Sequence, residues 1–194
     1  MGRLIINIAM TVNGAFEAPA PEPQGWLVTD PDSMQAGLEM WQAADAMVLG
    51  RRTYEGLSAA WPQLAHVPGF EAYAARMNSM PKYVASRTLT GPLTWNATLL
   101  EKGDLINSIV RLKEEHDGNL IVPCAGELAD SMIAADLVDE FWFNVSPYLW
   151  ASGPRVLDDL GPVRLELVTA TTFASGVVRL CYRPARDGAP HTRD

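Results

Sequence analysis

The stretch over residues 46–55 constrains this chain more than any other. Four apolar residues lead into Gly50, and Arg51, Arg52 and Thr53 follow directly. This pattern predicts a short buried strand, a glycine turn and a helix that begins with the two arginines. A helix N-terminus presents unpaired backbone N–H groups and partial positive charge, so two guanidinium groups beside it form a ready site for an anion such as phosphate. The stretch fits equally well a tight turn whose arginines are solvated or pair with surface carboxylates.

The overall composition limits the functions of the chain. It is 194 residues long, 48% hydrophobic and 20% charged, which is typical of one globular domain with a full hydrophobic core. We assign that domain to residues 1–184 and expect 185–194 to form a loose polar tail. The net charge of −8 argues against binding to nucleic acid or to an anionic membrane surface, because both need a broad basic surface. A local basic pocket can still hold one phosphorylated small molecule.

The sequence carries no signal for a membrane, for export or for a metal. No apolar run reaches the ~20 residues that a membrane span requires. The apolar N-terminal stretch breaks at Asn7, which is not typical of a signal peptide. Cys124 and Cys181 form no close pair, which indicates a reducing cytoplasm. The three histidines lack the spacing of metal ligands, so we expect no bound metal.

Strand and helix patterns alternate along the first two-thirds of the chain. Strands are predicted over 4–10, 45–49, 81–88, 98–100, 119–122 and 137–145, and helices over 33–43, 51–61, 69–80, 105–116 and 127–135. Asp32 and Ser33 are predicted to cap the first helix, and Pro62 to end the second. The last two strands, about 164–172 and 176–183, form a predicted hairpin. This order predicts an α/β fold with a mixed, mainly parallel sheet, flanked by helices and ending in an antiparallel C-terminal hairpin.

A proline-rich stretch over residues 15–31 has no hydrophobic period and is predicted to be a long loop. Long loops in compact domains are often functional lids. This one carries Trp26, which would either line a ligand pocket or make a plain core contact.

Three polar or glycine-containing segments, residues 50–53, 86–88 and 124–127, follow predicted strands. In open α/β sheets ligands bind outside the carboxyl ends of the strands, so we expect these segments to surround one ligand. Two helix N-termini and a Ser-Arg-Thr cluster suit a ligand with several phosphates. Arg87 beside Ser86 favours NADP over NAD, because an arginine accommodates the 2′-phosphate. Taken alone, the Ser-Arg-Thr cluster is read as a polar loop after a strand.

Longer motifs identify a resemblance to a known family. They are Thr11-Val12-Asn13-Gly14, the stretch 44–55, the stretch 80–89, Leu137-Val138-Asp139-Glu140, and the segment from Ser146-Pro147 to Ser152-Gly153. Over about residues 3–184 the sequence resembles the reductase domain shared by bacterial riboflavin-biosynthesis reductases and dihydrofolate reductases, and in particular the bacterial dihydrofolate reductase-like group. Any one of these motifs is weak, but together they are specific.

The resemblance implies an eight-stranded sheet and an NADPH-dependent reductase of a small heterocyclic or carbonyl/imine substrate. It implies that the cofactor phosphates are held by Gly50, Arg51, Arg52 and Thr53. It implies that Ser86 and Arg87, with Thr88 beside them, contact the adenosine 2′-phosphate. It also implies that a turn faces the pyrophosphate and the nicotinamide, and this turn consists of Cys124, Ala125, Gly126, Glu127 and Leu128. No residue of the sequence is identified as catalytic.

The chain departs from the family pattern at that turn. The resemblance implies that relatives usually have glycine in place of Cys124, and glycine or serine in place of Ala125. Side chains at both positions would narrow the approach of the cofactor, and Glu127 adds negative charge beside a pyrophosphate. A dihydrofolate reductase also needs one buried carboxylate on its first helix. The candidates are Asp30, Asp32 and Glu39, of which Asp32 is better explained as a cap and Glu39 as a solvated helix residue.

Two functional hypotheses therefore remain. The arginine and Ser-Arg clusters favour an NADPH-dependent reductase, whereas the altered turn and the unidentified proton donor favour a nucleotide-binding or ligand-sensing protein without catalysis. In either case we expect a homodimer with its interface in residues 137–150, because the riboflavin-type relatives that the chain resembles often pair and this stretch is rich in aromatic side chains. The alternative is that all of these side chains belong to the core. The aromatic residues in question are Phe141, Trp142, Phe143, Tyr148 and Trp150.

Overall fold

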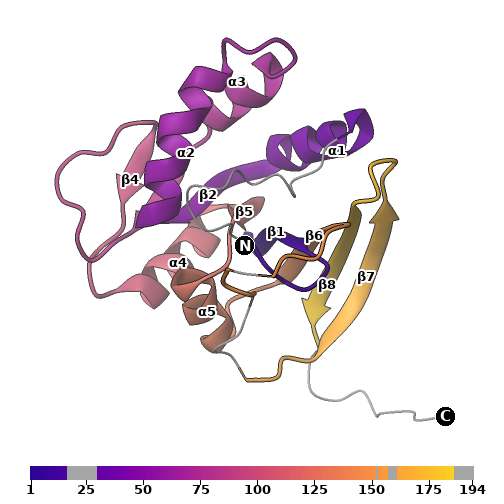
Figure 1. The fold of residues 1–194 in the computed structure, drawn as a ribbon. Coiled ribbons are helices and arrows are strands. Elements are labelled where there is room, and N and C mark those ends of the chain that lie inside the picture. The colour runs from indigo at the N-terminus through magenta and orange to yellow at the C-terminus, as the bar shows by residue number, and fades with distance from the viewer. Residues whose placement is uncertain (17–29, 152, 157–160, 186–194) are drawn as a thin grey trace.

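The computed structural model describes residues 1–16, 30–151, 153–156 and 161–185. Most of the stretch 15–31, including Trp26, and the tail after residue 185 lie outside these ranges, so the predictions made for them stay predictions. The described residues form one eight-stranded sheet with helices on both faces (Figure 1).

The sheet is mixed and mainly parallel. Its strands are β1 (Arg3–Thr11), β2 (Ala44–Gly50), β3 (Lys82–Ala85), β4 (Ala97–Leu99), β5 (Asn119–Val122), β6 (Glu140–Ser146), β7 (Leu165–Thr172) and β8 (Val178–Pro184). Their order across the sheet is β4-β3-β2-β5-β1-β6-β8-β7. Strands β1 to β6 pair in parallel, whereas β8 pairs antiparallel with β6 and with β7. The predicted fold class, including the antiparallel C-terminal hairpin, is therefore confirmed.

The helices form two layers around the central strands. They are α1 (Pro31–Gln42), α2 (Arg51–Leu64), α3 (Glu71–Ser79), α4 (Leu105–Glu115) and α5 (Glu127–Ala134). Successive strand residues point to opposite faces. Leu4 and Ile6 of β1 therefore pack in one core with Ile109 of α4 and Met132 of α5, while Ile5 packs in the other core beside α1 and α3. Because both faces are covered, the central strands are largely apolar, which is why their sequence pattern predicted them.

The start of α1 differs from the prediction. Its cap is Asp30 and not the pair Asp32–Ser33: the Asp30 carboxylate accepts from the Ser33 backbone N–H at 2.9 Å, and the Ser33 hydroxyl accepts from the Asp30 N–H at 2.9 Å. This reciprocal capping box leaves Pro31 at the first helical position, where its missing N–H costs nothing and its fixed φ suits the helix.

Other element ends also differ from the prediction, among them the end of β3 at Ala85 instead of residue 88. Pro62 lies inside α2, which continues to Leu64, because a proline in the last turn removes only one of the helix hydrogen bonds. Strand β6 begins at Glu140 rather than at residue 137. The Leu137 N–H instead bonds the Met132 carbonyl at 3.0 Å, so residues 137–139 form the turn that leaves α5.

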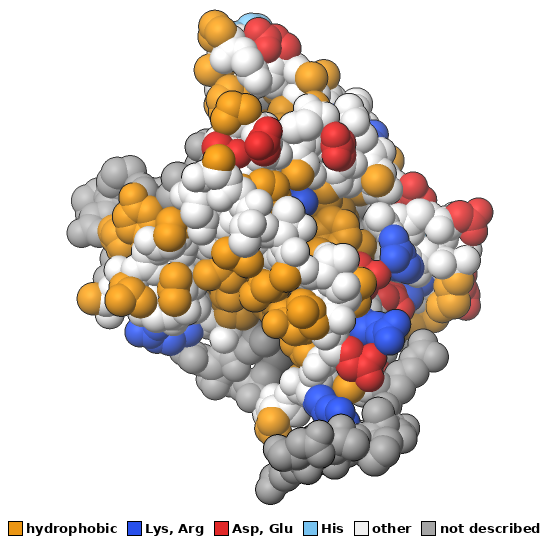
Figure 2. Space-filling view, turned by 90° about the vertical axis from the view of Figure 1, so that its right-hand side faces the viewer, with side chains coloured by type: hydrophobic (Ala, Val, Ile, Leu, Met, Phe, Trp, Pro, Cys, Tyr) orange, Lys and Arg blue, Asp and Glu red, His pale blue; other side chains and the backbone are white. Residues whose placement is uncertain are grey.

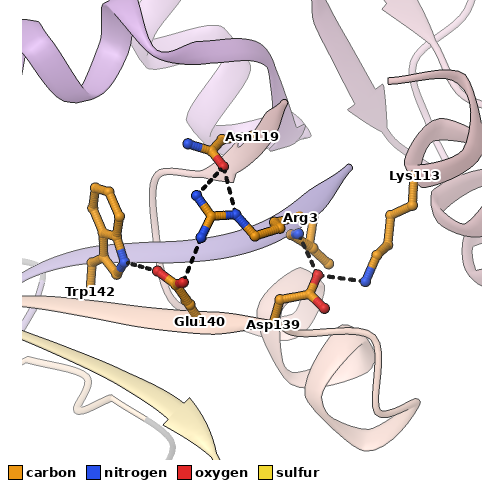
Figure 3. A network of polar contacts seen from close by, with 7 residues as sticks. Arg3, Lys113, Asn119, Asp139, Glu140 and Trp142 are labelled. Atoms are coloured by element: carbon orange, nitrogen blue, oxygen red, sulfur yellow. Dashed lines mark hydrogen bonds and ion pairs between the residues drawn. The ribbon is translucent and has the colours of Figure 1, made fainter. Parts of the chain in front are cut away.

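Charged side chains tie together the amino ends of β1, β5 and β6 (Figure 3). Arg3 of β1 donates to the amide oxygen of Asn119 on β5 at 3.0 and 3.1 Å, and to Glu140 on β6 at 2.8 Å. The second carboxylate oxygen of Glu140 accepts from the Trp142 indole N–H at 2.7 Å. Arg3 therefore bonds both strands that flank β1, which helps to fix their parallel register.

Asp139 extends this network to α4 (Figure 3). One of its carboxylate oxygens accepts from the Leu4 backbone N–H at 2.7 Å and from Lys113 Nζ at 2.6 Å. Lys113 also donates to the Leu137 carbonyl at 2.9 Å, and its side chain is only 9% exposed. The Lys113 charge is therefore paired where it is buried, as a buried charge must be.

The two edges of the sheet differ in length. Strand β4 has three residues, whereas β7 has eight, and β7 carries the exposed side chains Leu167 and Val168. Figure 2 shows the side of the molecule on which β7 and β8 lie in Figure 1, and hydrophobic side chains gather in the middle of this face. A long exposed edge strand offers unpaired backbone groups to another chain.

The aromatic residues that the sequence offered for a dimer interface are not all on the surface. Phe141 and Phe143 are buried in the core between the sheet and the α4–α5 layer, so these two cannot form an interface. Tyr148 is exposed, and Leu149 next to it is 76% exposed. The structure describes one chain, and dimer formation stays a prediction.

Candidate functional site

One large cleft lies at the carboxyl ends of the parallel strands, with a volume of about 1580 Å³. Its walls come from the ends of β1, β2, β3 and β5 and from the segments after β4 and β6. All the residues that the resemblance assigned to cofactor binding line this cleft. They are Gly50, Arg51, Arg52, Thr53, Ser86, Arg87, Thr88, Cys124, Ala125, Gly126, Glu127 and Leu128. The strand order brings them together, because β3, β2 and β5 are neighbours.

The N-terminus of α2 opens into the cleft. Gly50 is the residue before the helix, and no side chain caps the first turn, so its backbone N–H groups remain donors for a ligand. Gly50 has a φ of −77°, which any residue adopts, so its missing side chain provides room rather than a special conformation. The Arg51 guanidinium pairs with Glu55 at 3.0 Å on the same helix, and both side chains are nearly half exposed. Such a pair is weak and can open.

The segment after β3 forms a small polar turn. The Ser86 hydroxyl oxygen accepts from the backbone N–H groups of Thr88 and Leu89 at 3.1 and 2.9 Å. The turn leaves Arg87 on the surface of the cleft, where it forms an ion pair with Glu127 at 3.3 Å. Arg87 and Glu127 come from different strand ends, so this pair joins two walls of the cleft.

The turn after β5 holds the positions that depart from the family pattern. Gly126 has a φ of +110°, which side chains disfavour, so a glycine is required here and is retained. Cys124 and Ala125 are half-buried. The Thr53 hydroxyl donates to the Cys124 sulfur at 3.2 Å, which ties the first turn of α2 to the turn before α5. The thiol therefore sits between the starts of two helices.

The lining residues at the other end of the cleft, where β1 and the segment after β6 meet, were not predicted from the sequence. Ile8, Ala9 and Phe16 form an apolar wall there, and Arg155 lines the cleft beside them. The Arg155 guanidinium donates to the Asn13 carbonyl. The residues that follow β1 and β6 are far apart in sequence, so no local pattern predicts their meeting.

Reciprocal hydrogen bonds join the residues after β1 to the segment after β6 at this end of the cleft. The Asn13 side chain donates to the Trp150 carbonyl at 2.8 Å and accepts from the Trp150 N–H at 3.0 Å. The Val156 N–H bonds the Gly14 carbonyl at 2.9 Å. Residues 11–14, which carry part of the family resemblance, therefore hold the segment that contains Arg155.

The three carboxylates considered for a dihydrofolate reductase-type site lie elsewhere. Asp30 caps α1 and accepts from the Ser175 N–H at 3.0 Å, Asp32 is in the exposed first turn of α1, and Glu39 accepts from Gln35 at 2.8 Å. None of them lines the cleft. Across the described residues we find no group of three or more His, Cys, Asp or Glu side chains that could hold a metal ion. In the same part of the chain, no helix is both long and apolar enough to cross a membrane.

The sheet order, the hairpin at its end and the cleft define a dihydrofolate reductase-like α/β protein. Residues 3–179 match the family model of the RibD C-terminal domain, and the chain belongs to this family.

Three comparisons illustrate the relationship. The uncharacterized protein YyaP of Bacillus subtilis (strain 168) is 25% identical over 181 residues, which cover 93% of this chain and 94% of YyaP. A Shewanella sp. PV-4 protein named for riboflavin biosynthesis has a similar structure, with a TM-score of 0.75 and 20% identity over 95% of this chain and 99% of that chain. Dihydrofolate reductase from Enterococcus faecalis, solved in complex with NADP(H) and RAB-propyl, has a TM-score of 0.60 and 13% identity over 95% of this chain and 97% of its own. At these identities the two structural likenesses establish the fold.

Proposed function

We propose that this chain is an NADPH-dependent reductase of a small heterocyclic or carbonyl/imine substrate. Membership of the RibD C-terminal family supports a reductase-type role. The observation that carries the more specific proposal is the cleft, because it gathers the N-termini of α2, α4 and α5 and several arginines at one edge of the sheet. The position is the one at which open α/β sheets bind ligands.

The cofactor is proposed to lie along the strand ends in a defined direction. Ser86 and Arg87 after β3 bind the 2′-phosphate and so select NADPH over NADH. The first turn of α2, with Arg51 and Arg52, binds the phosphates that join the two halves of the cofactor. The nicotinamide then lies past the turn after β5, toward β1. The order β3-β2-β5-β1 across the sheet supports this path, because it matches the order of these chemical groups along the cofactor.

The substrate is proposed to bind at the β1 end of the cleft. Neighbouring strands lie about 4.8 Å apart, so the distance from β3 to β6 is about 19 Å, which leaves room for a second ligand beside the nicotinamide. The apolar wall of Ile8, Ala9 and Phe16 suits a flat ring, and Arg155 suits a polar substituent on it. Hydride transfer asks little of the protein beyond the orientation of the two rings.

The alternative is a nucleotide-binding or ligand-sensing protein on the same fold. The Cys124–Ala125 turn favours it, because two half-buried side chains stand where the family resemblance implies glycine or serine. The Thr53–Cys124 hydrogen bond fills part of the space between α2 and this turn. In its nucleotide-binding form this alternative shares the cofactor site and differs only in the absence of turnover.

One experiment separates the two functions. The purified protein is titrated with NADPH and with NADH, and NADPH absorbance is then followed after addition of pyrimidine, pterin or cyclic imine acceptors. We expect tighter binding of NADPH than of NADH, and consumption of NADPH with one acceptor class. Tight binding without consumption for any class favours the non-catalytic alternative. Absence of NADPH binding contradicts the reductase and leaves ligand sensing without this cofactor.

A further inference from the structure

The ion pair between Arg87 and Glu127 spans the cleft. Arg87 follows β3, and Glu127 is the first residue of α5, which follows β5. Strand β2 lies between β3 and β5 in the sheet, so the line from Arg87 to Glu127 passes over the end of β2. The first turn of α2 begins there, and both partners and that turn line the same cleft. The pair therefore lies in the cleft on either side of the strand that leads into α2, where an anionic ligand would bind.

This pair contributes little to the stability of the fold. The Arg87 and Glu127 side chains are 88% and 91% exposed, and their nitrogen and oxygen atoms are 3.3 Å apart. Exposed ion pairs of this kind are weak and screened by salt. Within the described residues, Glu127 is the side chain that the Arg87 guanidinium contacts. Both side chains can therefore change partners without disturbing the core.

The position of Glu127 favours its charge. As the first residue of α5 it lies at the positive end of the helix dipole, where a carboxylate is stabilised. A guanidinium binds carboxylate and phosphate oxygens by the same charge-assisted hydrogen bonds. A carboxylate fixed at this place can thus occupy the site that a phosphate would take.

We propose that Glu127 is an internal occupant of the Arg87 anion site and that the 2′-phosphate of the bound dinucleotide displaces it. The inference rests on the proposed cofactor site. In the free protein Glu127 holds the Arg87 guanidinium over the cleft. On binding, the phosphate takes over the guanidinium and Glu127 turns to solvent. Glu127 therefore sets how strongly the site prefers a 2′-phosphorylated ligand, and it lowers that preference.

The pair Arg51–Glu55 provides a contrast. Its partners lie one helical turn apart on α2, so Glu55 does not cross the cleft. The pair Arg183–Glu166 joins β8 to β7 and lies outside the cleft, with its charged atoms 2.9 Å apart. Glu166→Gln therefore removes the same charge as Glu127→Gln and breaks an arginine–glutamate pair away from the site, in which the Glu166 side chain is 35% exposed. It is the matched control.

The test measures the ratio of the affinities for NADP⁺ and NAD⁺ by calorimetric titration. The two ligands differ only in the 2′-phosphate, so the ratio cancels every contact that they share. Glu127→Gln should raise the ratio about two- to fivefold, the factor to which the strength of an exposed ion pair converts. Arg87→Ala should lower it, and the Arg87→Ala/Glu127→Gln double variant should match Arg87→Ala. Glu166→Gln should leave it unchanged.

The remaining outcomes separate this proposal from the one on which it rests. If wild-type protein binds NADP⁺ and Arg87→Ala lowers the ratio but Glu127→Gln does not raise it, the cofactor site stands and the displacement of Glu127 is overturned. A Glu127→Gln effect that persists in the Arg87→Ala background also overturns it, because the effect then does not pass through Arg87. If wild-type protein binds neither dinucleotide, both proposals fall. Thermal melting of each variant checks folding.

Discussion

The two ends of the parallel strands are built differently. At the amino end, Arg3, Lys113 and Asp139 make bonds of 2.6–3.1 Å to partners on β1, β5, β6 and the turn before β6 (Figure 3). At the carboxyl end, the arginine pairs that line the cleft are exposed, with distances of 3.0 and 3.3 Å, and neither α2 nor α5 has a side-chain cap. Charge is thus satisfied within the fold at one end and left accessible at the other.

This difference indicates that one end of the strands stabilises the fold and that the other end is available to a ligand. The bonds of Lys113 to Asp139 and Leu137 at the amino end hold the turn before β6 against α4, because the Lys113 side chain is only 9% exposed and losing its partner would leave a desolvated charge. Exposed ion pairs at the carboxyl end contribute little to the stability of the fold, so a ligand can replace one partner of such a pair at a low cost in free energy. Substitutions at the two ends should therefore affect different measurements.

The largest effect is expected from Arg51→Ala/Arg52→Ala at the carboxyl end. Each charged hydrogen bond lost to a cofactor phosphate should weaken NADPH binding by about 1.5–3 kcal/mol, while the free energy of unfolding changes little. Titration calorimetry measures the first quantity and urea unfolding the second. Unchanged NADPH affinity would remove the proposed phosphate site.

Asp139→Ala at the amino end should do the reverse. It leaves the buried Lys113 ammonium with only a carbonyl partner and leaves the Leu4 N–H without its side-chain acceptor. We expect the free energy of unfolding to fall by about 2–4 kcal/mol, with the NADPH affinity of the folded protein unchanged. Adding Lys113→Met should restore part of the loss, because it removes the unpaired charge. A loss below about 0.5 kcal/mol in urea unfolding would contradict the role of the network.

A third region, the β7 edge, should respond in assembly alone. We expect a homodimer in light scattering at micromolar concentration, with β7 at its interface. Leu167→Lys would then give a monomer without changing unfolding or NADPH binding, whereas Leu149→Glu, in the segment that the sequence favoured, would leave the dimer intact. If Leu149→Glu gives a monomer and Leu167→Lys does not, the interface lies in residues 137–150. If the wild-type protein is a monomer, the prediction of a dimer is wrong.

The smallest effect is expected at Asp30, which joins α1 to the β7–β8 hairpin. Hydrogen bonds from Ser175 and Ser33 lower the pKa of its carboxyl from 3.8 to about 2. A folded-state pKa below the unfolded one gives stability that is present above about pH 4 and is lost as the pH falls toward about 2. In thermal melts at a series of pH values, Asp30→Asn should flatten this acid-side slope. An unchanged slope would assign the acid sensitivity to other carboxylates.

Local sequence determined a large part of the fold. Apolar runs with both faces buried marked the central strands, and 3.6-residue periods marked the helices, because these patterns depend on near neighbours. The Gly-Arg-Arg-Thr segment directly follows a strand in the sequence, so its place at a strand end does not depend on the order of the strands. The prediction that Pro62 ends α2 was wrong. A helix tolerates a proline in its last turn, because few backbone hydrogen bonds of the helix follow it.

The sequence by itself thus determined which elements form and which of their ends carry arginine, serine and glycine. Only the tertiary structure decided which ends are neighbours. The order β3-β2-β5-β1-β6 joins residues 86–88, 50–53 and 124–128 in one cleft and brings Arg155 to its far end. It also sets Glu127 opposite Arg87 and Arg3 beside Asn119 and Glu140, across 40, 116 and 137 residues of chain. The reason is physical: strand order follows from packing two helix layers over one sheet, and that packing is a property of the whole chain rather than of any local segment.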